Sequence, residues 1–298
     1  MYFCRSKFNT MNTIRIGTRD SELALWQAKT VQNQLKTLGY PTEIVSTKSH
    51  GDIELSKPLY EMGVTGIFTK ALDIALLNGE IDIAVHSMKD VPTALPEGIA
   101  VGAVLKRGNP HDVLVYKDNL SFLEAEIATI ATSSLRRKAQ WLHRYPHHNI
   151  ENLRGNVNTR LQKLTDNPWN GAIFAAAGLE RINKLPEKHL VLDWMLPAPA
   201  QGAIVVVVRE DNVALQKKLL PLHDDYTYIA TQLERDFLRA LEGGCTAPIG
   251  AFAEFKDEKL YFKGGLWSED GKESSVIDEV LTQIDEYTGE KLATMVRS

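Results

Sequence analysis

The side chain best suited to covalent chemistry in this 298-residue chain is Cys245, the only cysteine after position 4. Gly243 and Gly244 come just before it and follow a stretch in which apolar residues recur at every fourth position. That spacing is typical of an amphipathic helix. Glycine often ends a helix, because it readily adopts the left-handed conformation of the C-cap. We therefore expect a loop that presents Cys245 to a ligand, although a lone cysteine is more often a small buried apolar side chain.

A second group suited to chemistry consists of arginines that follow predicted strands. The six are Arg19, Arg136, Arg137, Arg154, Arg160 and Arg181. In open α/β sheets ligands bind beyond the carboxyl ends of strands. Each arginine alone is more readily explained as a solvated side chain or a local ion pair. Together they predict a cleft for a ligand with several carboxylate or phosphate groups, because a guanidinium group binds such anions through two parallel hydrogen bonds.

Asp90 is the one carboxylate embedded in the basic set, directly after Lys89. Two interpretations are equally supported by its position. It could be the ion-pair partner of a neighbouring cation, or it could act as a general acid/base or stabilise a developing positive charge. Ser133 and Ser134, at a predicted helix start, would add backbone N–H donors for an anion.

Composition excludes several other classes of function. The net charge of −4 argues against general nucleic-acid binding, yet residues 132–181 carry a local net charge of +5. No stretch approaches the roughly 20 apolar residues of a membrane span, and residues 1–10 are too short and polar for a secretory signal. The chain has only two cysteines and no pattern typical of a disulfide framework, which favours a reducing compartment. We expect a soluble, cytoplasmic protein. We expect no metal site, with His147 and His148 on an exposed turn.

The order of predicted elements indicates an α/β fold with a smaller α+β domain at the C-terminus. Strands and helices alternate twice in the first 200 residues, which predicts mainly parallel sheets. The predicted strands of this part lie at 13–17, 43–47, 81–86, 112–116, 127–131 and 172–177. A late apolar strand at 203–208 is expected to return to the first sheet. After residue 223 we expect a long helix, two strands at 249–254 and 260–267, and an acidic C-terminal helix.

Five segments resemble motifs of the porphobilinogen deaminase (hydroxymethylbilane synthase) family. They are IGTRDSELALWQA (16–28), AVHSMKDVPT (84–93), TSSLRR (132–137), LRGNVNTR (153–160) and LEGGC (241–245). They occur in one order and with compatible spacing, from about residue 12 to the C-terminal helix. The resemblance implies three domains, of which the first two are similar to the lobes of class II periplasmic binding proteins. We place them at 12–108 with 201–222, at 109–200, and at 223–298.

The resemblance also implies an activity and a cofactor. Such an enzyme condenses four porphobilinogen molecules head to tail, releases ammonia and yields hydroxymethylbilane for haem biosynthesis. The primer is a dipyrromethane, implied here as a thioether on Cys245. Each pyrrole carries an acetate and a propionate, so that many arginines would be needed. Deamination leaves an electron-poor, azafulvene-type cation that a carboxylate would stabilise.

The family's functional positions carry over onto matching residues of this chain. Asp90 matches the catalytic aspartate. The positions implied for cofactor binding, besides Cys245, are Asp52, Ser87, Lys89, Thr132, Ser133, Ser134, Arg136, Arg137 and Arg154. The positions implied for substrate binding are Arg19, Phe68, Arg154, Arg160 and Arg181. The sequence departs from the family at 61–68, where lysines common in members are missing, and at Ala200, where glycine is more usual.

Two other functions fit the sequence less well. A non-catalytic anion-binding protein on the same two-lobed scaffold would have a secretion signal and would not need Cys245. Nucleic-acid binding through the basic segment is disfavoured by the net charge and by the scarcity of aromatic residues among the arginines. We therefore predict a monomeric porphobilinogen deaminase whose ligand is a small molecule, with neither nucleic acid nor membrane as a partner.

Overall fold

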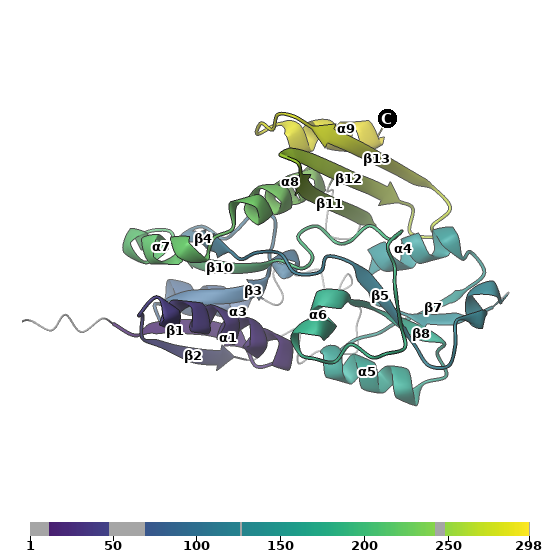
Figure 1. Cartoon of the computed structure of the whole chain (residues 1–298), viewed down its shortest axis with the longest axis horizontal. Helices are drawn as coiled ribbons and strands as arrows, with labels where there is room; N and C mark the ends of the chain where they lie inside the picture. The colour runs from purple at the N-terminus through teal and green to yellow at the C-terminus, as the bar shows by residue number, and fades with distance from the viewer. Residues whose placement is uncertain (1–11, 48–68, 126, 242–247, 298) are drawn as a thin grey trace, which may run out of the picture.

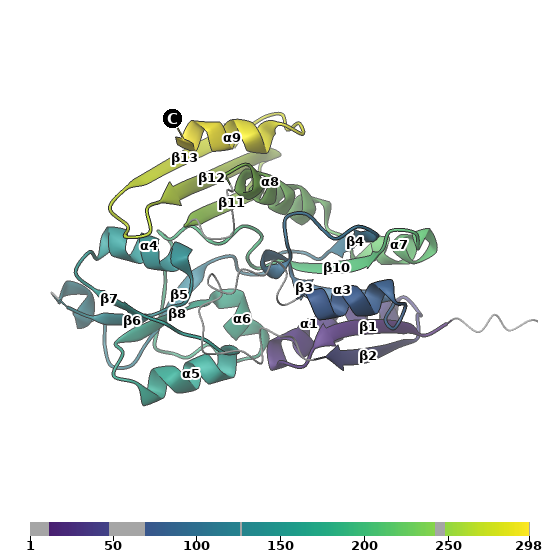
Figure 2. The ribbon, with the colours of Figure 1, turned by 180° about the vertical axis from the view of Figure 1, so that it is seen from behind.

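The computed structural model describes residues 12–47, 69–125, 127–241 and 248–297. Their strands form three separate sheets, two of five strands and one of three (Figures 1 and 2). Each sheet draws its strands from one of the three expected domain ranges. The predicted class, two α/β lobes and a smaller α+β unit, is confirmed.

The first sheet has the strand order β2-β1-β3-β10-β4. Its strands are β1 (Ile14–Arg19), β2 (Thr42–Thr47), β3 (Ile83–Ser87), β4 (Ile99–Val104) and β10 (Ile204–Arg209). Its helices are α1 (Glu22–Thr37), α3 (Lys70–Leu77), α7 (Val213–Leu219) and the short η2 (Met88–Asp90) and η4 (Leu220–Leu222). β10 returns to this sheet as predicted. Its run of isoleucine and valine is buried on both faces, since residues from it belong to two different cores.

The second sheet has the order β7-β6-β8-β5-β9. Its strands are β5 (Asp112–Tyr116), β6 (Thr129–Ala131), β7 (Asn149–Glu151), β8 (Gly171–Ala175) and β9 (His189–Val191). Its helices are α4 (Leu135–Arg144), α5 (Val157–Asp166), α6 (Ala176–Arg181) and the short η3 (Ser121–Glu124). The predicted strand at 172–177 ends two residues early, because Ala176 and Ala177 already belong to α6.

The third sheet is an antiparallel meander of β11 (Ile249–Lys256), β12 (Lys259–Trp267) and β13 (Ser274–Leu281). Helices α8 (Asp225–Leu241) and α9 (Thr288–Arg297) contribute to its core. Figure 1 shows this layer lying over the other two sheets, with α8 on the side of β4 and β10 and with α4 beneath the sheet on the other side.

Three sequence-based expectations about these elements are wrong. The α/β sheets are mixed rather than mainly parallel, because β10 runs antiparallel to β3 and β4, and β5 runs antiparallel to β8 and β9. β13 was not predicted, although its buried and exposed residues alternate. His148 does not lie on an exposed turn. It is buried beside Trp141, whose indole N–H donates to its Nδ1 at 3.3 Å.

Two chain crossings join the α/β lobes, and they run side by side. The Gly108 N–H donates to the Gly202 carbonyl at 3.0 Å. A Cβ on Gly202, whose φ is +88°, would lie 2.8 Å from the Gly108 carbonyl oxygen. Glycine is therefore required for this close approach. Ala200, where the family more usually has glycine, has a φ of +62°, in a region that favours glycine.

A buried carboxylate on α8 joins the third layer to both crossings. Glu234 is fully buried and forms an ion pair with Arg107, with Oε1 and Oε2 at 2.5 and 3.1 Å from the two terminal nitrogens. The same carboxylate accepts from the backbone N–H groups of Ala200 at 2.6 Å and Ala253 at 2.7 Å. One side chain thus connects α8, both crossings and β11.

We predict that Glu234→Gln lowers the free energy of unfolding by about 3 kcal/mol, because it leaves the Arg107 charge without its buried counter-ion. Thermal unfolding measures this effect as a lower Tm. Glu254→Gln is the matched control: Glu254 pairs with Lys256 at the surface, where an ion pair contributes less than about 1 kcal/mol. Equal losses in the two variants would contradict the role given to Glu234.

Candidate active site

The sharp turn after β3 carries two of the predicted site residues. Ser87 ends β3, and Lys89 and Asp90 lie in the 3-10 turn η2 that follows it. The Gln27 side-chain amide donates to the Ser87 hydroxyl at 2.8 Å, and the Met88 N–H donates to the Ala203 carbonyl at 3.0 Å. Asp90 is exposed at the end of this turn. The loop is therefore held by its backbone and by Ser87, while the Asp90 carboxylate stays accessible.

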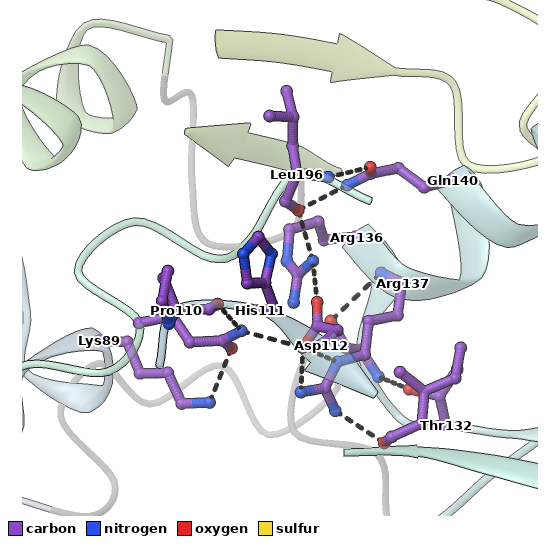
Figure 3. A network of polar contacts seen from close by, with 12 residues as sticks. Lys89, Pro110, His111, Asp112, Thr132, Arg136, Arg137, Gln140 and Leu196 are labelled. Atoms are coloured by element: carbon purple, nitrogen blue, oxygen red, sulfur yellow. Dashed lines mark hydrogen bonds and ion pairs between the residues drawn. The ribbon is translucent and has the colours of Figure 1, made fainter. Parts of the chain in front are cut away.

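Arg136 and Arg137 lie in the first turn of α4 and share the fully buried carboxylate of Asp112, the first residue of β5 (Figure 3). Arg136 binds Oδ2 at 2.7 Å, and Arg137 binds Oδ1 through Nε at 3.0 Å and a terminal nitrogen at 2.7 Å. Burial raises the pKa of Asp112, but attraction by the two arginines outweighs it and holds that pKa well below its usual range. Two cations and one anion leave this cluster with a net positive charge.

Gln201 connects that cluster to the first lobe. Its amide nitrogen donates to the Asp112 carboxylate at 3.0 Å and to the Pro110 carbonyl at 2.7 Å, and its amide oxygen accepts from the Lys89 ammonium at 3.1 Å. Burial lowers the pKa of Lys89 to about 8, while Asp90 next to it acts in the opposite direction. Lys89 is therefore a cation held beside the Asp112 cluster (Figure 3).

Arg160 on α5 brings residues of both lobes into one electrostatic group. Its pKa is lowered to about 10, mainly by burial; repulsion by Arg137, Arg154 and Arg19 acts in the same direction, and attraction by Asp90 opposes it. Its Nε donates to the Gly155 carbonyl at 2.7 Å. Since Arg19 and Asp90 come from the first lobe and the other cations from the second, the predicted residues converge where the two lobes face each other.

The hydroxyl residues of the second lobe lie at the start of α4. Ser134 caps this helix and accepts from the Arg137 N–H at 3.4 Å. Ser133 is engaged with the backbone of Leu153, accepting from its N–H at 2.9 Å and donating to its carbonyl at 2.6 Å. Thr132 accepts from the Ser134 N–H at 3.2 Å. These contacts fix the loop beside Arg154, which is itself buried.

Arg181 is the predicted site residue whose described contacts lie elsewhere. It ends α6, donates to the Gly202 carbonyl at 2.5 Å, and stands over the Trp26 ring of α1 at 5.7 Å from the ring centroid. Its described partners thus belong to the crossing and to α1 rather than to the Lys89 and Arg160 group. Asp52, Phe68 and Cys245 lie outside the described residues.

Sequence reasoning missed Asp112 and Gln201, which organise the charged cluster. Asp112 looks like an ordinary residue at the start of a strand. The available signal was the pair Arg136-Arg137, because two adjacent arginines in one buried helix turn require a counter-ion. Gln201 lies in a proline-rich connection and gave no such signal.

Comparison with known protein families identifies the family of this chain. Residues 14–217 match the family model described as porphobilinogen deaminase, dipyromethane cofactor binding domain, and residues 228–297 match the model described as porphobilinogen deaminase, C-terminal domain. The chain belongs to the porphobilinogen deaminase family. The matched ranges contain the mixed sheets of the two lobes and the three-stranded third layer.

Individual relatives support the same family. The chain is 44% identical over 276 residues to porphobilinogen deaminase of Syntrophotalea carbinolica, covering 91% of this chain and 87% of that protein. It is 43% identical over 277 residues to a probable porphobilinogen deaminase of Methanocaldococcus jannaschii, covering 92% and 94%. With the porphobilinogen deaminase of Desulforamulus reducens the identity is 45% over 263 residues, covering 87% and 85%.

Solved structures also align with this porphobilinogen deaminase family member, at low sequence identity. The periplasmic VFT2 domain of Bordetella pertussis BvgS aligns with a TM-score of 0.42 at 13% identity, covering 70% of this chain and 85% of that domain. A probable amino-acid ABC transporter binding protein, ytmK of Bacillus subtilis, aligns with a TM-score of 0.44 at 13% identity, covering 76% and 97%.

Two kinds of feature, a membrane-spanning helix and a cluster of metal ligands, are absent from the described part of the chain. Within residues 12–47, 69–125, 127–241 and 248–297, no helix has the length and apolar character needed to cross a membrane. Over the same residues, no group of three or more histidine, cysteine, aspartate or glutamate side chains is arranged to hold a metal ion.

Proposed function

We propose that this chain condenses four porphobilinogen molecules head to tail on a covalently bound dipyrromethane primer, releasing ammonia and then hydroxymethylbilane. The observation that carries the proposal is that one accessible carboxylate, Asp90, lies among buried and partly buried cations from two facing lobes. The cations suit the acetate and propionate groups of a growing pyrrole chain. The carboxylate suits the positive charge that develops when a pyrrole loses ammonia.

The charged cluster fits a dipyrromethane, which brings two acetates and two propionates. Arg136 Nε is buried and has no hydrogen-bond partner among the described residues, so that this donor is available to a carboxylate. Lys89, Arg136, Arg137 and Arg154 would hold the four anionic groups, together with hydroxyls from Ser87 and from Thr132, Ser133 and Ser134. When bound, the dipyrromethane supplies the electron-rich pyrrole carbon to which the first substrate couples.

The remaining roles fall to side chains on both lobes. Arg19, Arg160 and Arg181 are proposed to bind the carboxylates of the incoming porphobilinogen. Asp90 would face the pyrrole N–H, stabilise the cation formed as ammonia leaves, and accept the proton that the α-carbon of the acceptor pyrrole loses as that ring regains its aromaticity. Asp52 and Phe68 remain proposals for the cofactor and the substrate. The thioether anchor is proposed at Cys245.

Two further properties belong to the same proposal. A chain that carries its own primer and all its catalytic groups can act as a monomer, and its substrate and product are small molecules. Cytoplasmic residence agrees with the use of only two cysteines in 298 residues.

Product stoichiometry tests the proposed function directly. Purified protein is incubated with porphobilinogen, and ammonia and hydroxymethylbilane are quantified in the same samples. We expect four ammonia molecules for each hydroxymethylbilane. Binding of porphobilinogen without ammonia release would instead identify a non-catalytic binding protein.

The charge of Lys89 predicts a pH dependence. Since the pKa of Lys89 is lowered to about 8, its ammonium is present below that pH and is lost as pH rises through it. We therefore expect the rate at which apoprotein attaches its primer to fall above pH 8, because no cofactor carboxylate faces Lys89 in the apoprotein. In Lys89→Arg the charge persists at higher pH, and the fall should move upward. Superimposable pH profiles of the two proteins would contradict the assignment.

A further inference from the structure

The helix that precedes the proposed cofactor anchor also holds the proposed catalytic loop. Arg235 on α8 is 6% exposed. One of its terminal nitrogens donates to the carbonyls of Met88 at 3.2 Å and Val91 at 2.9 Å, and the other donates to the Pro92 carbonyl at 2.5 Å. These three carbonyls flank Lys89 and Asp90 on both sides. A side chain of the third layer therefore fixes the backbone of the turn that presents Asp90.

Besides Arg235, two backbone hydrogen bonds and the burial of Met88 and Val91 in a hydrophobic core hold this loop. The Met88 N–H is tied to Ala203 at 3.0 Å, and the Val91 N–H closes the 3-10 turn on the Met88 carbonyl at 3.2 Å. Pro92 has no N–H to donate. The Pro92 carbonyl accepts a hydrogen bond from the Arg235 fork. A guanidinium group reaches several carbonyls at once because its five donors lie in one rigid plane.

A second residue of α8 fixes the helix from which Arg235 extends. Its neighbour Glu234 joins α8 to Arg107, Ala200 and Ala253, so that the base from which Arg235 reaches is itself fixed. The last residue of α8 is Leu241, and Cys245 follows four positions later in the sequence. The same helix therefore leads to the anchor and supports the turn that carries Asp90.

We propose that Arg235 is a positioning residue for catalysis: it holds the 88–92 turn so that the Asp90 carboxylate faces the reacting pyrrole. This inference rests on the proposed function and adds a residue that the sequence motifs did not indicate. Arg235 acts through Asp90 and does not itself contact substrate. Its contribution should therefore appear in the rate of the chemical step rather than in substrate binding.

A double-mutant cycle separates positioning from general support of the fold. Single-turnover rates are measured for wild type, Arg235→Lys, Asp90→Asn and the double variant, each as holoprotein with its adduct mass confirmed. Lysine keeps the charge but loses the fork. We expect Arg235→Lys to slow elongation about tenfold or more with KM within about twofold of wild type. In the Asp90→Asn background, the same change should cost less than about twofold.

Arg239→Lys is the matched control, because Arg239 lies on the same helix, is half exposed and pairs only with Asp236 in its described contacts. It should keep the wild-type rate. Should Arg235→Lys fail to fold, as judged by thermal unfolding, Arg235→Gln enters the same cycle, since its amide keeps one donor group.

Two outcomes of the cycle distinguish failure of the Arg235 inference from failure of the proposed function. An equal loss of rate from the Arg235 change in both backgrounds would overturn the positioning role, because a purely structural effect is independent of Asp90. A normal elongation rate in Asp90→Asn alone would contradict the proposed function itself, and with it the inference. Different variants report the two failures, so that they can be told apart.

Discussion

Replacing Cys245 with serine is expected to abolish both the covalent adduct and the turnover of porphobilinogen. A serine hydroxyl is a much weaker nucleophile than a thiolate at neutral pH, so no primer would be attached. Without a primer, the first coupling has no acceptor. Intact-mass measurement of the purified variant and an assay of ammonia release report the two losses separately.

Cys4→Ser is the natural control, because Cys4 is the only other cysteine. It should leave both the adduct mass and the turnover unchanged. A wild-type adduct on the Cys245→Ser protein would place the anchor at another residue.

Asp90→Asn is expected to slow elongation at least about a hundredfold while the covalent cofactor is retained. Asparagine has nearly the same shape but no negative charge, and a preorganised charge beside a developing cation is often the largest catalytic term. The neighbouring cations give a second way to distinguish an enzyme from a protein that only binds anions. Because Asp90 attracts Lys89 and Arg160 electrostatically, a protein that only binds anions would gain affinity when this charge is removed.

Single-turnover kinetics on protein of confirmed adduct mass measure this effect. Asp90→Glu keeps the charge and moves it by one methylene group, so that partial activity is expected. Tighter binding together with an unchanged rate in the Asn variant would leave Asp90 with a structural role only.

The sequence predicted the order of most elements because their hydrophobic patterns are strong. The run Ile204–Arg209 is apolar enough to be placed in a sheet interior, and its return to the first sheet was expected. Its direction was not, since nothing local in a strand tells whether its neighbours run parallel or antiparallel. β4 was not predicted. Its sequence has no clear alternation of apolar and polar residues, because the strand is partly buried on both faces.

The candidate site was predictable one residue at a time but not as a network. Strand-end positions and motif resemblance identified Lys89, Asp90 and Arg160. Two partners that hold the site were missed. Asp112 lies 24 and 25 positions before the two arginines that it binds. Arg235 lies 143 to 147 positions after the carbonyls that it binds. Distance in the sequence hides such contacts, because a counter-ion or a backbone clamp is recognised only when the chain has brought the two groups together.

The central claim is that the chain extends a pyrrole oligomer covalently attached to itself. Mass spectrometry under denaturing conditions tests it most directly, on wild-type protein sampled shortly after mixing with limiting porphobilinogen. We expect the mass of the polypeptide plus a dipyrromethane before mixing, followed by a ladder of species that each carry one more pyrrole unit. Only the bare polypeptide mass, before and after mixing, would contradict it.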